Sequence, residues 1–182
     1  MCTLLFLATQ SSLWSNDVAQ LAIDGNRDAN LADRSCSSTS EETNPWWRVD
    51  LLGRYSVTAV TVTNREDCCP TRIDGAEIHI GNSLDNNGID NPRSVVTGQT
   101  YTFQCNEMEG RYVVLVIPGQ AQYLTLCEVE VYGTASFSNN NQTRSELKDL
   151  TVLLYTAPEK IKRPQHLFSF LSKKVKKRKV LS

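Results

Sequence analysis

The sequence predicts an all-β protein built from antiparallel strands, and three patterns support this fold class. Five segments alternate polar and apolar residues, namely 47–51, 57–63, 76–80, 100–105 and 126–132. A period of two with one apolar face is typical of a half-buried antiparallel strand. Residues 112–117 are continuously apolar, as expected of a central strand. Turn-forming clusters at 24–26, 85–88 and 118–119 separate the segments, and this punctuation favours a sandwich or barrel over an α/β fold.

Residues 24–45 differ from the predicted strands because they are polar and show no period of two. A loop of this length inside a compact domain is usually functional, or is held in place by another part of the molecule. We therefore expect this segment to contain part of a binding site and to be fastened to the sheet.

Charge divides the chain into two parts. Residues 1–133 carry a net charge of -9 and contain no lysine, whereas residues 134–182 carry +8 and include the basic run 173–179. A folded unit rarely separates its charges in this way, so we predict a domain that ends near Gly133 and a basic, disordered tail after it. The basic run could instead form a nuclear-localisation-like or anion-binding patch. The acidic body argues against nucleic acid as a partner.

The beginning of the chain is apolar over residues 1–8. This stretch falls at the short end of the apolar core of a secretory signal, so we expect a truncated signal followed by a domain over residues 9–133. No segment reaches the ~18 consecutive apolar residues that indicate a membrane-spanning helix.

The cysteines favour an oxidising, extracellular compartment. The adjacent pair Cys68-Cys69 and the widely separated Cys36 and Cys127 favour such a compartment, and a set of buried free thiols is the alternative. Neighbouring Cα atoms lie ~3.8 Å apart, below the usual disulfide range of ~4.4–6.8 Å, so a bond between adjacent cysteines would distort its turn. No Cys-x-x-Cys or Cys/His spacing is present, which argues against zinc.

Several motifs in one order resemble the F-type lectins, the fucolectins of fish and horseshoe crab. They are AIDGNRD at 22–28, NPWWRVDL at 44–51, TNREDCC at 63–69, RIDGAEI at 72–78, and GRYVV at 110–114 with LCEVEV at 126–131. The resemblance extends from about Ala8 to Gly133. It implies an antiparallel β-sandwich with jelly-roll topology, related to the discoidin-type domains of coagulation factors.

The resemblance also implies a sugar site. An arginine offers five donors in a planar fork that can bond neighbouring hydroxyls of a neutral sugar, and the matching residues are Arg65 and Arg72. By the same resemblance Asp67 orients an arginine, and a Cys68–Cys69 disulfide contacts the sugar. Surface arginines paired with Glu66 and Asp67 are the alternative.

The predicted sugar site departs from the family on one side. The family carries a histidine where this chain has Ser38, and Leu31 and Ala32 stand near the place of an aromatic residue that lines the sugar's methyl group in relatives. A lost sugar hydrogen bond costs ~0.5–1.5 kcal/mol, or roughly threefold to tenfold in affinity. We therefore predict weakened or altered sugar specificity.

A calcium site is the second implication of the resemblance. Calcium takes ~6–8 oxygen ligands from carboxylates, carbonyls and hydroxyls. The matching carboxylates are those of Asp24 and Glu128, and the matching backbone carbonyls are those of Leu21, Asn26, Ser35 and Cys127. The family equivalents of Cys36 and Cys127 form a disulfide beside these ligands. Relatives pair Cys105 within its preceding loop, which has no cysteine here, so Cys105 is a thiol or a partner of Cys2.

These implications describe a secreted, calcium-dependent lectin that binds fucosylated glycans in innate immune recognition and agglutinates as a homo-oligomer. A structural or adhesion domain that keeps calcium but has lost fucose binding is the alternative. An enzyme is disfavoured because no nucleophile–base pair, paired-carboxylate motif or phosphate loop is present.

Overall fold

The computed structural model describes residues 7–95, 100–136 and 151–153. Its strands are β1 (Leu7–Gln10), β2 (Ser37–Ser38), β3 (Glu42–Thr43), β4 (Trp46–Thr63), β5 (Glu77–Gly81), β6 (Arg93–Val95), β7 (Thr100–Val116), β8 (Ala121–Gln122), β9 (Thr125–Leu126), β10 (Glu128–Ala135) and β11 (Thr151–Leu153). Short 3-10 helices are η1 (Ala19–Ile23), η2 (Leu31–Asp33), η3 (Pro70–Ile73) and η4 (Asp85–Gly88). The predicted all-β, antiparallel fold is confirmed, and no helix in these ranges is long or apolar enough to cross a membrane.

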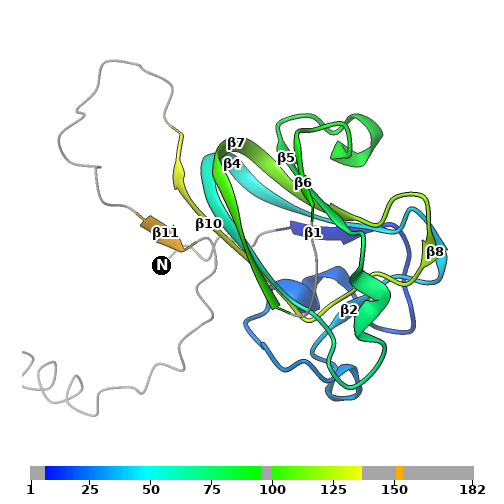
Figure 1. Ribbon diagram of the computed structural model, residues 1–182. Helices are drawn as coiled ribbons and strands as arrows, with labels where there is room; N and C mark the ends of the chain where they lie inside the picture. The colour runs from blue at the N-terminus through cyan, green and yellow to red at the C-terminus, as the bar shows by residue number, and fades with distance from the viewer. Residues whose placement is uncertain (1–6, 96–99, 137–150, 154–182) are drawn as a thin grey trace, which may run out of the picture.

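One hydrogen-bonded ladder supplies both layers of the sandwich. Residues 46–50 of β4 lie between β1 and residues 112–116 of β7, and β5 and β6 extend that part beyond β7. Residues 55–63 of β4 instead lie between β10 and residues 100–110 of β7. The register shifts between Asp50 and Tyr55 and again between Val57 and Ala59, as expected where a bulge bends a sheet. Figure 1 shows β4 and β7 curving together through the molecule.

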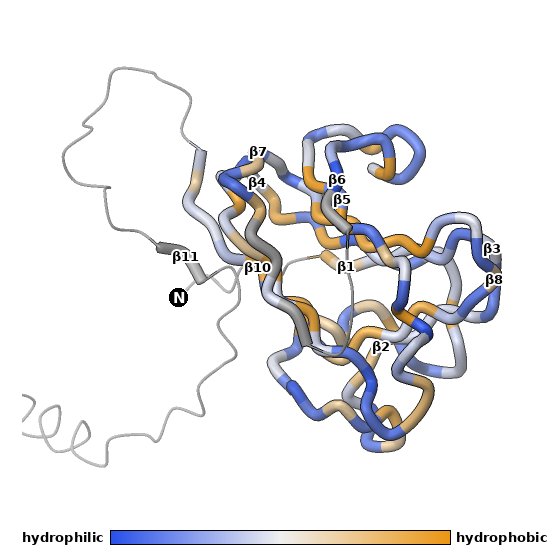
Figure 2. The backbone as a smooth tube through the Cα atoms, in the orientation of Figure 1, coloured by the Kyte–Doolittle hydropathy of each residue, from blue (hydrophilic) through white to orange (hydrophobic). Residues whose placement is uncertain are grey.

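The second register shift, between Val57 and Ala59, changes which residues of β4 face the core. Before it the buried side chains include Val49 and Val57, and after it they include Val60 and Val62. The buried set therefore moves from odd to even positions, because one extra residue in a strand turns every later side chain to the other face. All four side chains belong to one apolar cluster shared by the two layers. Figure 2 shows the apolar stretches along the strands and the polar ones along the loops.

The segment between β1 and β4 folds against one end of the sandwich (Figure 1). The indole N–H of the buried Trp47 donates to the carbonyl of Ala19 at 3.0 Å, which fixes η1 to the sheet. Two-stranded sheets formed by β2 with β9 and by β3 with β8 attach the rest of the segment. The long polar segment is thus held along its length, and it is this end of the fold that positions the candidate sites.

Two boundaries differ in detail from the sequence prediction. Segments 47–51 and 57–63 form the single strand β4, and segments 100–105 and 112–117 form β7. β10 continues to Ala135, two residues past Gly133, and residues 151–153 pair with it as β11. Cys2, most of the predicted tail and the basic run 173–179 lie outside the described residues.

Candidate functional site

A pocket of about 210 Å³ lies where three parts of the chain meet. They are the loop that follows β4, strand β2, and the segment that precedes β9. It is lined by Trp14, Leu31, Ser38, Arg65, Cys68, Arg72 and Tyr123. Four of these residues, Ser38, Arg65, Cys68 and Arg72, belong to the sugar site that the sequence predicts. The fold therefore brings together side chains that are up to 34 positions apart in the sequence.

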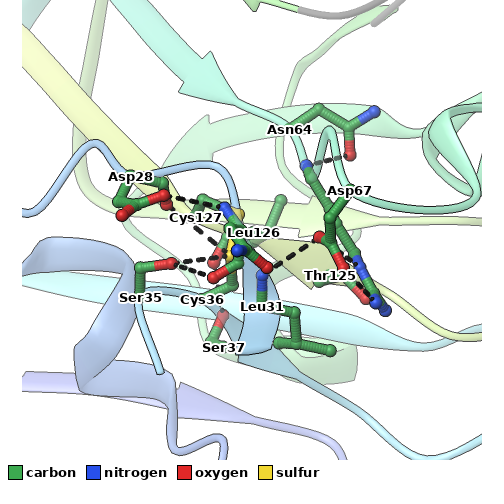
Figure 3. The surroundings of a disulfide bond; sticks show 12 residues. Asp28, Leu31, Ser35, Cys36, Ser37, Asn64, Asp67, Thr125, Leu126 and Cys127 are labelled. Atoms are coloured by element: carbon green, nitrogen blue, oxygen red, sulfur yellow. Dashed lines mark hydrogen bonds and ion pairs between the residues drawn. A yellow bond between two sulfur atoms is a disulfide. The ribbon is translucent and has the colours of Figure 1, made fainter. Parts of the chain in front are cut away.

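Arg65 is oriented by a two-point ion pair with Asp67. Its Nε and Nη2 atoms donate to the two carboxylate oxygens of Asp67 at 2.8 and 2.6 Å. The same carboxylate accepts the backbone N–H of Leu31 at 3.0 Å, which connects the arginine to η2 (Figure 3). The hydrogen bond from Arg65 lowers the pKa of Asp67 to about 2. The pair uses the Nε hydrogen and one of the two Nη2 hydrogens, so three donors remain, two on Nη1 and one on Nη2.

Arg72 is held in a different way, because its guanidinium lies over an aromatic ring. The Cζ atom stands 4.5 Å from the centroid of Tyr123, within the range of a cation–π interaction. No carboxylate or carbonyl in the described part of the chain bonds this guanidinium. Its N–H groups are therefore available to a ligand in the pocket.

Cys68 and Cys69 form a disulfide between sequence neighbours, as the sequence suggested. Cys69 adopts a positive φ of 56°, a conformation that side-chain-bearing residues rarely take outside tight turns. The buried Asn64 stabilises this turn from within: its Nδ2 donates to Pro70 O and its Oδ1 accepts from Arg65 N, both at 2.8 Å. The disulfide therefore belongs to a braced turn that presents Cys68 to the pocket.

Ser38 lines the pocket, but its hydroxyl is already engaged. The Oγ atom lies 3.1 Å from the hydroxyl of Thr125, its partner across the β2–β9 pair, and 3.2 Å from Thr39 O. The residue is 2% exposed. Serine at this position therefore forms part of the pocket floor, and it does not extend into the pocket as a longer side chain would.

The predicted calcium ligands lie on three segments that meet outside the pocket lining. The segments are residues 21–26 at the end of η1, residues 35–36, and residues 127–128 at the start of β10. The Cys36–Cys127 disulfide joins two of them, and Glu128 Oε2 accepts the Gly25 N–H at 3.1 Å. Figure 3 shows Ser35 beside this disulfide.

Glu128 is a buried carboxylate with one oxygen that no hydrogen bond satisfies. The residue is 0% exposed, and Oε1 has no hydrogen-bond partner among the described residues. Burial, together with the nearby charge of Asp24, raises its pKa to about 8. A buried carboxylate without a partner is costly, and a bound cation would remove that cost. The residues present therefore fit a cation.

The other predicted ligands lie on the three segments that meet at this carboxylate. Asp24 follows η1 and accepts the Asn26 N–H at 2.8 Å, Leu21 lies within η1, and Cys127 directly precedes Glu128. Ser35 is buried, and its hydroxyl donates to Asn30 O at 2.8 Å. No group of three or more His, Cys, Asp or Glu side chains suitable for a metal occurs in the residues described. An ion held here would depend largely on backbone carbonyls, which suits calcium and not zinc.

Comparison with known proteins decides the family. A family model described as a NedA-like, galactose-binding domain matches residues 21–115. Fucolectin-1 of Anguilla japonica is 55% identical over 135 residues, which are 68% of this chain and 75% of the relative. The chain belongs to the F-type lectin family. As a lectin it is a carbohydrate-binding protein and not an enzyme.

Solved structures agree with this assignment. An F-lectin (fucolectin) from striped bass serum, Morone saxatilis, superposes with a TM-score of 0.70 at 53% identity, covering 72% of this chain and 46% of that one. This chain thus spans less than half of the striped bass structure. The lectin domain of lectinolysin, solved in complex with Lewis B antigen, superposes with a TM-score of 0.64 at 28% identity, covering 71% and 93%. The jelly-roll β-sandwich is therefore the fold of this F-type lectin.

Two residues that line the lectin's pocket were missing from the sequence prediction. Leu31 lines the pocket near the place where relatives have an aromatic residue. Trp14 and Tyr123 supply aromatic rings to the pocket from other segments. Neither lies in a motif that resembles the family, and they are more than 100 positions apart. The sequence shows each only as an aromatic residue outside the predicted strands, so nothing in it placed them together at a site.

Proposed function

We propose that this F-type lectin is a secreted protein that binds the terminal L-fucose of glycans in the pocket between Arg65 and Arg72. The observation that carries the proposal is the convergence of two guanidinium groups with an apolar wall in one small pocket. L-Fucose has hydroxyls on one edge and a methyl group on the other. The arginines suit the hydroxyls, and Leu31 with the Cys68–Cys69 disulfide suits the methyl group.

The arrangement of the arginines supports binding of a neutral sugar. The charge of Arg65 is already balanced by Asp67. Its remaining donors can therefore bond a ligand that has no acidic group. Arg72 rests on Tyr123, which orients its guanidinium without occupying its N–H groups. Both side chains are therefore positioned before binding, which lowers the entropic cost of ordering them around the sugar.

Calcium has a structural role in this proposal. Asp24 and Glu128 would supply carboxylate oxygens, and Leu21, Asn26, Ser35 and Cys127 would supply backbone carbonyls. A bound ion would neutralise the buried carboxylate of Glu128 and fasten the loop after η1 to β10. The stability of that loop would then depend on calcium even though the ion stands outside the sugar pocket.

Ser38 supports the further proposal that fucose affinity is weaker than in relatives with histidine. Its hydroxyl bonds Thr125 and Thr39 O within the pocket floor, so it replaces a longer donor poorly. Weak single sites can still give firm attachment to a glycan-covered microbial surface when several are joined, so we include recognition by homo-oligomers in innate immunity. The two disulfides support an extracellular location.

Calorimetric titration of L-fucose at saturating calcium tests the proposal. Arg72→Ala should abolish measurable binding. Arg54→Ala, which removes an exposed arginine outside the pocket, should leave it unchanged. If the wild-type protein gives no heat of binding while calcium still raises its melting temperature, the alternative of a calcium-stabilised structural domain replaces this one.

A further inference from the structure

Trp14 and Tyr123 form a continuous aromatic wall on one side of the pocket. Their ring centroids are 5.4 Å apart with an interplanar angle of 88°, an edge-to-face contact. Tyr123 also lies under the guanidinium of Arg72, whose Cζ is 4.5 Å from the ring centroid. Tyr123 therefore contacts both Trp14 and the proposed sugar-binding Arg72.

Trp14 is unusually exposed for its size, although its backbone is firmly held. Its side chain is 48% exposed. Its N–H donates to Ser38 O at 3.0 Å, and its carbonyl accepts the Asp17 N–H at 3.1 Å. The carbonyl of Asp17 in turn accepts the Ser38 N–H at 3.0 Å, so the turn is bonded twice to Ser38 of β2. An exposed aromatic ring on a fixed backbone at a pocket's edge is typical of a ligand contact.

The size of the pocket indicates what this ring would meet. The volume of about 210 Å³ is below the ~300–1,000 Å³ of clefts that hold drug-sized ligands, so it suits about one sugar ring. When a terminal fucose is bound at Arg72, its glycosidic bond must point out of the pocket, toward the next sugar of the glycan. The wall from Tyr123 to Trp14 is one route out of the pocket, and the C–H faces of a pyranose pack well against aromatic rings.

We propose that Trp14 and Tyr123 form a second subsite, which binds the sugar unit to which the terminal fucose is attached. This inference rests on the proposed function, because it places fucose at Arg65 and Arg72. Its substrate class is a fucosylated disaccharide or longer glycan, in preference to the monosaccharide. Tyr123 serves both subsites by supporting Arg72, whereas Trp14 at the rim serves chiefly the second.

The test compares methyl α-L-fucoside with α-fucosyl disaccharides of 1→2, 1→3 and 1→4 linkage by calorimetry at saturating calcium. At least one disaccharide should bind the wild-type protein about three- to tenfold more tightly than the methyl glycoside. Trp14→Ala should reduce that ratio to about one. Trp14→Phe should retain part of it. Leu13→Ala, which removes an exposed apolar neighbour that does not line the pocket, should leave the ratio unchanged.

The outcomes separate this inference from the proposed function. If the methyl glycoside binds but no disaccharide binds more tightly, the second subsite does not exist and the fucose site stands. If Trp14→Ala weakens both ligands equally, Trp14 belongs to the first subsite and the inference is wrong. If the wild-type protein binds none of the probes, both proposals fall together. Thermal melting of each variant shows whether a lost affinity reflects a lost fold.

Discussion

Asp67 offers the sharpest test of how the sugar pocket works, because it orients an arginine without lining the pocket itself. Asp67→Ala removes the acceptor of two Arg65 donors and of the Leu31 N–H. The sugar contacts remain, but Arg65 must then be ordered on binding, at about 0.5–1.5 kcal/mol for one side chain. The dissociation constant should rise between about 2-fold and 13-fold. Arg65→Ala removes direct hydrogen bonds of a charged donor and should cost more, about 1.5–3 kcal/mol for each bond.

Calorimetry with methyl α-L-fucoside at pH 7 and saturating calcium measures these differences. Asp90→Ala is a matched control, because Asp90 is an exposed acid beside the distant η4 turn. Two results would refute the reasoning. An unchanged affinity in Asp67→Ala would show that Arg65 needs no orienting partner. A loss as large as that of Arg65→Ala, with an unchanged melting temperature, would show that Asp67 contacts the sugar directly.

Three further predictions concern pH and stability. Because the pKa of Asp67 is lowered to about 2, its ion pair is complete above the usual value near 3.8 and is lost only as the pH falls through about 2. The affinity ratio of wild type to Asp67→Ala should therefore stay constant from pH 7 to about pH 4; a decline already at pH 5–6 would contradict this. Removing the Cys36–Cys127 disulfide, which spans 91 positions, by Cys→Ala changes at both positions should lower the free energy of unfolding by about 4–5 kcal/mol on the chain-entropy model, and an unchanged urea midpoint would oppose it. Glu128→Gln keeps an acceptor for the Gly25 N–H but removes the charge, so calcium should raise the melting temperature of wild type much more than that of the variant; equal shifts would exclude Glu128 as a ligand.

The strands were predictable from the sequence because each layer buries one face, and burial leaves a period of two in the chain. The joining of strands was not predictable in this way. Leu52 takes a positive φ of 61° between the two halves of β4, and Asp50 Oδ1 accepts its N–H at 2.8 Å. The chain can therefore bend there without leaving the ladder. Hydrophobic alternation records only which residues are buried, so it cannot distinguish such a bend from a turn between two strands.

The pocket was predictable in part, and the part that was missed has a different physical origin. Arg65, Arg72 and the cysteine pair lie on one short stretch, and the resemblance of its motifs to the F-type lectins is what identified them as a shared site. Trp14 and Tyr123 meet beside the pair formed by β2 and β9, because the Trp14 N–H donates to Ser38 O of β2 and Tyr123 shortly precedes β9. Contacts of that kind depend on the register of strands distant in sequence. No local pattern in a single sequence contains that information.

The two candidate sites are connected by one short piece of backbone. The loop that begins at Asp24 beside Glu128 continues to Ala29, whose carbonyl accepts the Glu66 N–H at 2.8 Å, and to Leu31, whose N–H donates to Asp67 at 3.0 Å. These two bonds fasten the calcium-side loop directly to the turn that holds Arg65. If a cation orders the beginning of this loop, it would also order the turn that orients Arg65, because only a few residues lie between Asp24 and Leu31. Binding at either site would then favour binding at the other, and the coupling must be equal in both directions. If the proposed cation binds at Glu128, a long polar loop fastened at both ends would therefore couple it to the affinity for the sugar.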